Sequence, residues 1–409
     1  MPRVLITLML STFTIGTAES VIAGILPPIA RDTNVSLRAV GLLITVYALV
    51  VVVTGPIVTA MCNRFSRRSV LMACMTVFAI GNLVCALAPG YNGLIIGRAI
   101  SALTHSTLIA VAVACARDLA PPHQRARASA QVTLGIGLAT VLGVPAGTAV
   151  GDHFGWRATF TALTLLSLFS LLLLAVSRLP EPIPRQPAAQ GDGTARSSRS
   201  VPPGALATAV VIICGTAGVF TLYTYAVPYL TQVAGLPTSL TTPILLLYGA
   251  GGIVGNILGA KMADRSHHHA ALTALVTGTM CLLGLAAARH IPPAVPILLT
   301  LVGLAYFATI PALNAQIVAA APRTDPAVAL AVNNSAFCIG IALGSWLGGT
   351  LLAHQPLAVL PLASASLTAL ALAVQMAISW RSDNTSLRSR VSTEPDRLVS
   401  AGHARPGSG

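Results

Sequence analysis

Residues Val4 to Pro28 read VLITLMLSTFTIGTAESVIAGILPP, an apolar run long enough to cross roughly 30 Å of hydrocarbon as a helix. Glu19 lies deep inside this run, and it is the only carboxylate so placed in any apolar segment of the chain. Because an acid within a membrane span is costly, Glu19 is a candidate functional residue. The alternative is that Glu19 lies near the outer interface and reaches water from there.

The composition of the whole chain agrees with that of this first run. Of 409 residues, 55% are apolar and 9% are charged, and the mean hydropathy is +0.79. Soluble proteins average about 25% charged residues, so the composition excludes a soluble enzyme. The net charge of +13 does not indicate nucleic-acid binding, because the basic residues stand in short clusters between apolar runs. Seven cysteines without CxxC spacing predict neither a disulfide framework nor a metal site.

Twelve apolar runs predict twelve membrane-spanning helices. Helices are expected because they satisfy their own backbone hydrogen bonds in lipid, and the runs do not alternate as the strands of a barrel would. The expected spans are residues 4–28, 38–61, 69–89, 91–115, 129–151, 157–178, 205–230, 242–262, 270–288, 293–318, 328–353 and 357–380.

The basic residues predict the orientation, because cytoplasmic loops carry the excess of lysine and arginine. With both termini in the cytoplasm, 19 of the 24 basic residues are cytoplasmic, four are outside, and Arg98 alone lies within a span. The chain is therefore predicted to begin and end in the cytoplasm.

The chain also repeats itself at an offset of 201 residues. Matching pairs include Pro27 with Pro228, Tyr47 with Tyr248, Gly143 with Gly344 and Gly147 with Gly348. A duplicated six-helix unit is typical of a transporter in which two halves move around a site between them. The predicted domains are a six-helix bundle at 1–180, a cytoplasmic linker rich in Pro, Gly, Ser and Arg at 181–204, a second bundle at 205–380 and a disordered cytoplasmic tail at 381–409.

Arg98 is the expected partner of Glu19. An arginine at the bilayer centre costs about 2.5–3.5 kcal/mol on insertion scales, so it requires a partner. At 1.5 Å per residue, Glu19 lies about 22 Å from the inner end of its helix and Arg98 about 10 Å from the outer end of its own, which places both in the outer third. The two residues could meet across a central cavity and couple a proton to transport. The alternative is that Arg98 makes a purely structural hydrogen bond to helix ends.

Six further polar or amphipathic residues in apolar spans are candidates for the substrate cavity, since such residues need partners or water in a membrane. They are His105, Tyr223, Tyr225, Asn314, Asn333 and Asn334. His105 has a reference pKa near 6.5, which makes it a possible titrating group. The alternative for each residue is a hydrogen bond between helices.

Two cytoplasmic loops and the fifth span carry motifs. The loop residues are Asn63, Arg64, Arg67 and Arg68 in the first half, and Asp264 and Arg265 in the second. This pattern resembles the loop signature of the major facilitator superfamily, Gly-x-x-x-Asp-Arg-x-Gly-Arg-Arg/Lys. The first copy departs from it, since Thr59, Asn63 and Ser66 replace the first Gly, the Asp and the second Gly.

The fifth span places Gly143, Gly147 and Gly151 four residues apart, which lines one helix face and lets a neighbouring backbone approach closely. Pro145 removes a helical hydrogen bond and favours a bend. This stretch looks like the antiporter motif of the same family. With the opening GTAESVIAGILP, the chain from Val4 to Trp380 is most similar to bacterial twelve-span drug:proton antiporters of the arabinose-efflux-permease and chloramphenicol-resistance branch.

That resemblance implies two pseudo-symmetric six-helix bundles in the bacterial inner membrane that export a small organic compound, chloramphenicol-like by analogy, in exchange for protons. It gives Glu19 and Arg98 the coupling roles, and it implies a monomer in lipid without cofactor or metal. The alternatives are a sugar or nucleoside transporter, proton-coupled or not, a receptor that binds without translocating, and, third, a membrane enzyme. The sequence has no Gly-x-x-x-x-Gly-Lys-Ser/Thr phosphate loop, which argues against direct nucleotide drive.

Overall fold

A computed structural model describes residues 2–62, 64–121, 124–177, 202–321 and 326–401, and all regular structure in these ranges is helical. Eleven helical segments are long and apolar enough to cross a membrane. The pair α1 and α2, bent by 47°, makes a twelfth if it forms one span. The all-helical, multi-span prediction is therefore confirmed for the described residues.

The elements follow the expected spans, with interruptions in four of them. The first half contains α1 (Pro2–Ser20), α2 (Ile22–Asp32), α3 (Leu37–Cys62), α4 (Arg67–Ala86), α5 (Tyr91–Ala102), α6 (His105–Leu119), α7 (Arg125–Leu138), η2 (Ala139–Gly143), α8 (Val144–Phe154) and α9 (Trp156–Val176). The second contains α10 (Pro203–Tyr223), α11 (Ala226–Pro228), η3 (Tyr229–Val233), η4 (Thr238–Leu240), α12 (Thr241–Ala263), α13 (His267–Ala287), α14 (Ala294–Ala319), α15 (Pro326–Leu352), η5 (Leu357–Val359) and α16 (Leu360–Ala401).

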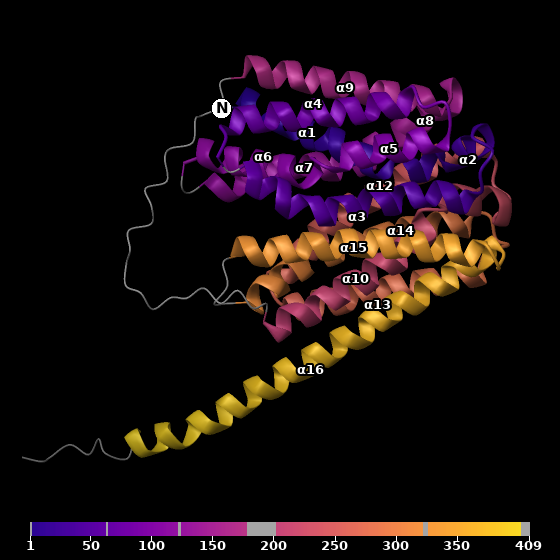
Figure 1. The fold of residues 1–409 in the computed structure, drawn as a ribbon. Coiled ribbons are helices and arrows are strands. Elements are labelled where there is room, and N and C mark those ends of the chain that lie inside the picture. The colour runs from indigo at the N-terminus through magenta and orange to yellow at the C-terminus, as the bar shows by residue number, and fades with distance from the viewer. Residues whose placement is uncertain (1, 63, 122–123, 178–201, 322–325, 402–409) are drawn as a thin grey trace, which may run out of the picture.

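Helices of each half pack mainly on one another, and the halves lie side by side (Figure 1). In the first half α4 packs on α5 and α9, and in the second α12 packs on α14 while α10 packs on α15 and α16. Contact between the halves is made chiefly by α3 with α15, by α2 with α11, and by η2 and α8 with α12.

The break between α1 and α2 has a visible cause. In a continuous helix the carbonyls of Ala18 and Glu19 would accept hydrogen bonds from residues four positions later. Here both accept from the guanidinium of Arg98 instead. A side chain inserted into the hydrogen-bond ladder is a common origin of a kink. The first span is therefore bent by a residue of the fourth.

Proline explains two further interruptions. Pro145 has no backbone N–H to donate, and the turn before it, η2, is a π-helix in which the Val144 N–H bonds to the Ala139 carbonyl. Pro228 likewise follows the break between α10 and α11 and precedes the π-helical η3. The bend expected at Pro145 is thus a wider helical turn in the structure.

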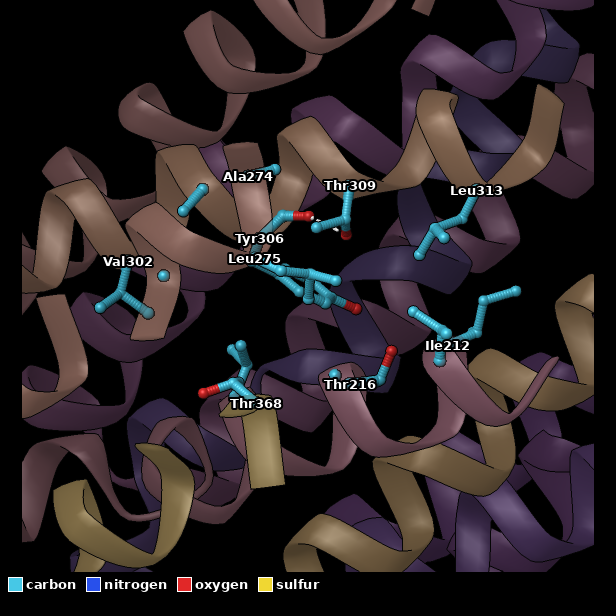
Figure 2. A pocket seen from close by; sticks show the side chains of 14 residues that line it. Ile212, Thr216, Ala274, Leu275, Val302, Tyr306, Thr309, Leu313 and Thr368 are labelled. Carbon is cyan, nitrogen blue, oxygen red and sulfur yellow. Dashed lines mark hydrogen bonds between the residues drawn. The ribbon is translucent and has the colours of Figure 1, made fainter. Parts of the chain in front are cut away.

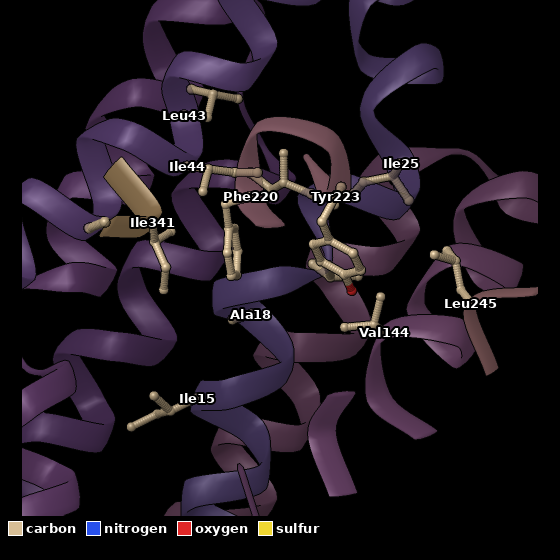
Figure 3. Close-up of a cluster of buried hydrophobic side chains, with 14 of the residues drawn as sticks. Ile15, Ala18, Ile25, Leu43, Ile44, Val144, Phe220, Tyr223, Leu245 and Ile341 are labelled. Atoms are coloured by element: carbon tan, nitrogen blue, oxygen red, sulfur yellow. The ribbon is translucent and has the colours of Figure 1, made fainter. Parts of the chain in front are cut away.

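One large cluster of buried apolar side chains runs through both halves (Figure 3). Ile15, Ile25 and Leu43 contribute from the first half, and Phe220 and Leu245 from the second. A separate smaller cluster lies within the second half, between α10, α13, α14 and α16. The central cluster places the end of α1, and hence Glu19, where the two halves meet.

The predictions for the linker and for the tail have different outcomes. Residues 178–201, most of the linker, lie outside the described residues. The tail was expected to be disordered from residue 381, whereas α16 continues as a helix to Ala401 and extends past the other helices (Figure 1). Its 42 residues span about 63 Å at 1.5 Å per residue, twice the thickness of the hydrocarbon. The domain boundaries themselves remain predictions.

Candidate functional site

Glu19 is the second-last residue of α1 and its side chain is half-buried. The carboxylate is close enough to interact electrostatically with Tyr47 and Arg98 in its own half. It also interacts with Tyr306 on α14 and Cys338 on α15, across the boundary. Glu19 therefore lies beside the second half of the chain.

Arg98 on α5 is 1% exposed and bonds to backbone. Its guanidinium donates to the Ala18 carbonyl at 2.5 Å and to the Glu19 carbonyl at 3.3 Å, and it lies 4.0 Å from the ring centroid of Tyr47. No ion pair joins it to the Glu19 carboxylate within the described chain. The contacts are those of the structural alternative, a guanidinium that caps carbonyls at a helix end, since the bend of α1 provides free acceptors there.

His105, the first residue of α6, is buried and belongs to the same group. Its Nδ1 is 2.9 Å from the Tyr47 hydroxyl, and the two rings meet edge to face with centroids 5.6 Å apart. Tyr47 thus connects Arg98 to His105. Sequence reasoning did not select Tyr47 for the site, although its match with Tyr248 in the repeat was a usable signal.

The candidate tyrosines of the second half have two different environments. Tyr223 stacks on Tyr248 with centroids 4.7 Å apart and belongs to an aromatic cluster. The other members of that cluster are Phe220, Tyr306 and Phe307. Tyr225 is fully buried, and its hydroxyl donates to the Ser345 carbonyl at 3.1 Å while packing against Gly41 of the first half. Tyr225 is therefore part of the seam between the halves, and the aromatic cluster stands nearer to Glu19.

The asparagines form a separate pair between α14 and α15. Asn333 donates from Nδ2 to Oδ1 of Asn314 at 2.6 Å, and Asn334 is exposed. The buried Oδ1 of Asn333 has no hydrogen-bond partner within the described chain. In the described residues no contact connects these three asparagines to the group around Glu19. The prediction had assigned to one cavity residues that the structure places in two separate clusters.

The glycines of the fifth span contact the broken first span. A Cβ at Gly143 would lie 2.0 Å from Oγ1 of Thr17, and at Gly147 it would lie 2.5 Å from Cγ2 of Val21. Gly151 meets Ile25 in the same way. Pro145 is buried on the same helix. The small residues therefore let α8 approach the segment that carries Glu19, from both sides of the bend.

The loop residues form contacts at the end predicted to be cytoplasmic. Arg67 pairs with Asp118 at the end of α6, and Arg68 donates to the Ala175 carbonyl of α9. Arg64 lies over the Phe65 ring, and Asn63 lies outside the described residues. Asp264 and Arg265 of the second half are exposed and form no ion pair within the described chain.

Two cavities lie near these groups. One, of about 20 Å³, lies between α10, α13, α14 and α16 and is almost entirely apolar, with Tyr306 on its wall (Figure 2). The other, of about 490 Å³, lies between the first part of α1, the end of α6 and α7. In the described residues no group of three His, Cys, Asp or Glu side chains is placed to hold a metal.

Comparison with known proteins identifies a family. A family model described as Major Facilitator Superfamily matches residues 8–345. The chain is 35% identical over 357 residues to the uncharacterized MFS-type transporter YfhI of Bacillus subtilis (strain 168), covering 85% of this chain and 87% of that protein. It is 33% identical over 349 residues to the inner membrane transport protein YdhP of Escherichia coli (strain K12), covering 85% and 88%.

Solved structures agree with the fold. A D-xylose-proton symporter matches with a TM-score of 0.74 at 17% identity, covering 91% of this chain and 96% of that one. A bacterial homolog to the human lysosomal transporter Spinster, in an inward-facing and occupied conformation, matches with a TM-score of 0.72 at 18% identity, covering 92% and 96%. At these identities the likeness concerns the arrangement of helices alone.

Proposed function

We propose that this chain, which belongs to the Major Facilitator Superfamily of membrane transporters, exports a small organic compound in exchange for protons. The setting would be a bacterial inner membrane, with both termini in the cytoplasm, as the distribution of basic residues predicts. The compound would be a drug-like molecule, for which chloramphenicol is the analogue suggested by the resemblance of the first and fifth spans.

The single observation that carries this proposal is the state of Glu19. Its carboxylate is half-buried, stands at the boundary between the halves, and is not paired with Arg98, whose guanidinium is used by backbone carbonyls. An acid that is neither paired nor fully buried can bind and release a proton without breaking an ion pair. That is the requirement for a coupling acid.

Protonation of Glu19 would change the free-energy cost of removing its carboxyl group from water. An ionised carboxylate needs solvation or a partner, and the neutral acid needs much less of either. Ionised Glu19 therefore favours an arrangement in which water or a substrate group reaches it, and neutral Glu19 tolerates closure against Tyr306 and Cys338. A proton moving down a membrane potential supplies about 2.3 kcal/mol per 100 mV, enough to concentrate a substrate severalfold.

Packing around α1 would transmit that change. Gly143, Gly147 and Gly151 hold α8 against Thr17, Val21 and Ile25, and α8 in turn packs on α12 of the second half. A shift at the bend of α1 therefore cannot occur without a response in α8. This arrangement supports a role of the glycine motif in coupling the two halves.

The test is a panel of antimicrobial compounds on cells that lack their own efflux pumps. We expect the wild-type chain to raise resistance to at least one compound and Glu19→Gln to abolish the gain at equal expression. Asp152→Asn is the matched control, because Asp152 is an exposed acid at the end of α8. Equal protection by wild type and Glu19→Gln would remove Glu19 from the mechanism.

Proteoliposomes then separate exchange from facilitation. Addition of the compound found in the panel should drive proton movement in the opposite direction, and collapse of the proton gradient should stop its accumulation. Flux that is independent of the gradient would instead indicate a facilitator.

A further inference from the structure

The fourth span is interrupted partway along its length, as the first span is. Helix α5 ends at Ala102 and α6 begins at His105, with two turn residues between them. Helix α1 ends at Ser20, directly after Glu19. Because α1 packs on α6, the acid at the end of one helix and the imidazole at the start of the other lie in the same interior region and interact electrostatically.

The two ring nitrogens of His105 have different surroundings. Nδ1 lies 2.9 Å from the Tyr47 hydroxyl, and the two rings meet edge to face. Nε2 makes no hydrogen bond to the described residues, and it is not one of their fully enclosed unpaired atoms. Although His105 is only 4% exposed, Nε2 therefore lies at the accessible edge of the ring. A residue that carries protons needs such an edge, because the proton must arrive and leave there.

Two charged groups face this ring. Glu19 from α1 attracts an imidazolium, and Arg98 from α5 repels it. When Glu19 is ionised, its charge offsets that of Arg98, and His105 can take a proton at a moderate cost. When Glu19 is neutral, burial and Arg98 both oppose a charge on His105. Glu19 and His105 are therefore alternative positions for one proton.

The other helices around His105 bring no further charge to the ring within the described residues. Helix α3 contributes the hydroxyl of Tyr47, and Cys338 of α15 lies beside that tyrosine. The interior titratable groups of α4 are the thiols of Cys74 and Cys85, which are neutral near physiological pH. The only titratable residues of α7 are arginines in its first turn. The protonation of His105 therefore depends mainly on Glu19.

His105 also lies on the side of Glu19 toward which protons would flow. The guanidinium of Arg98 reaches the Glu19 carbonyl, so Arg98 marks the depth of Glu19 in the membrane. His105 follows Arg98 by seven residues, which places it about 10 Å nearer to the end predicted to be cytoplasmic, at 1.5 Å per residue. A proton that leaves Glu19 for the cytoplasm would therefore pass His105.

We propose that His105 is a second proton-binding residue, which takes the proton from Glu19 at Nε2 and passes it toward the cytoplasm while Tyr47 holds the ring in position. This inference rests on the proposed function, for which it adds the step that follows proton release by Glu19.

The proposed step uses the tautomer of His105 in which Nδ1 carries the proton. Nδ1 then donates to the Tyr47 oxygen, and the lone pair of Nε2 faces the accessible space. The O–H bond of Glu19 breaks and an N–H bond forms at Nε2, with one water molecule relaying the proton. Glu19 becomes a carboxylate as His105 becomes an imidazolium, so the net charge of the group is unchanged. The Nε2–H bond then breaks, and the proton leaves to water on the cytoplasmic side.

Magnetic resonance of histidine-labelled protein in lipid tests the proton site without any transported compound. The signal of His105 is assigned by its loss in His105→Asn. We expect this signal to show the gain of a proton as the pH is lowered from about 9 to about 5. The midpoint should fall by about one pH unit or more in Glu19→Gln, because the attracting charge is lost.

Thr104→Val is the matched control for this titration. Oγ1 of Thr104 is buried directly before His105 and has no hydrogen-bond partner in the described chain, so its removal should leave the midpoint unchanged. A His105 signal that stays neutral at every pH would overturn the proposal. An equal midpoint in wild type and Glu19→Gln would also overturn it.

Transport assays distinguish proton transfer from a structural role. His105→Asn leaves an amide that can still donate to the Tyr47 oxygen but cannot bind a proton. In proteoliposomes with the compound selected by the resistance panel, we expect proton-driven accumulation to slow about tenfold or more. Exchange of the compound without a gradient should stay close to the wild-type rate, because it needs no net proton release. If thermal unfolding shows this variant to be misfolded, His105→Gln replaces it.

The outcomes separate this inference from the proposed function. Equal loss of accumulation and of exchange in the His105 variant would mean a structural role and overturns the proposal, while the Glu19 test stays intact. Unchanged accumulation in that variant overturns it as well. Coupled titration of His105 and Glu19, in a chain whose resistance is unaffected by Glu19→Gln, supports the proton pair and overturns export driven by Glu19.

Discussion

In the N-terminal half Glu19, Arg98 and His105 bring ionisable groups to the interior. The residues 201 positions later in the repeat carry no carboxylate, guanidinium or imidazole: they are Phe220, Leu299 and Tyr306. Tyr47 and Tyr248 occupy corresponding positions of the repeat, so this position is a tyrosine in both halves. Tyr47 contacts Arg98 and His105, while Tyr248 stacks on Tyr223 and meets Phe307. The same framework thus holds a charged group in one half and an aromatic cluster in the other.

This difference suggests that the two halves have different roles in transport. Within the described chain the only interior acid, Glu19, lies in the first half and faces an aromatic surface that cannot itself change charge near neutral pH. Coupling would then depend on one half and substrate contact largely on the other. The following predictions are arranged to test that division, from the largest expected effect to the smallest.

Arg98→Leu should have the largest effect, because it converts the first half to the residue of the second. The Ala18 and Glu19 carbonyls would lose their donor, at about 1.5–3 kcal/mol for each hydrogen bond to a charged group. We expect export to fall to background in proteoliposomes with equal protein content. The control is Leu299→Met, a volume-conserving change at the corresponding buried position. If both variants export normally, the charged group is dispensable and the comparison fails.

Substitutions in the two glycine stripes should differ in their effect on stability, because the stripes contact different kinds of atoms. A Cβ at Gly344 would lie 2.4 Å from the backbone oxygen of Ala217, whereas at Gly143 it meets the Thr17 side chain, which can rotate. We expect Gly344→Ala to lower the free energy of unfolding by about 2–3 kcal/mol and Gly143→Ala by about 1–2 kcal/mol. Gly137 has open space around it, so Gly137→Ala should stabilise its helix by up to about 1 kcal/mol.

Thermal and denaturant unfolding in detergent would rank the three variants. The reverse order for Gly143 and Gly344 would indicate that α1 is less adaptable than α10, contrary to the bend seen at Val21.

Removal of one hydroxyl should have the smallest effect and should also distinguish the halves. Tyr47→Phe removes the partner of the buried His105 and should cost about 1 kcal/mol of stability. The Tyr248 hydroxyl makes no hydrogen bond within the described chain, so Tyr248→Phe should change stability by less than about 0.5 kcal/mol. Unfolding midpoints of both purified variants would measure this. A larger loss in the Tyr248 variant would mean that the aromatic cluster contains a polar interaction of its own.

Local features of the chain determined most of the fold. Apolar length set the spans, since crossing the hydrocarbon requires about twenty such residues whatever their neighbours are. The repeat at 201 residues and the glycines four apart could be read directly, because they reflect periodicity along one chain. Glu19 and Arg98 stood out for the same reason: each is a charge in an apolar run.

The partners of these residues were decided by tertiary structure. Arg98 was expected to meet the Glu19 carboxylate, but helix packing set its guanidinium against the carbonyls of Ala18 and Glu19, about eighty residues away in the chain. The bend of α1 and the separation of the Asn314–Asn333 pair from Glu19 have the same origin. The sequence determines which groups must be buried or solvated, whereas the angle and depth at which helices cross determine which groups meet.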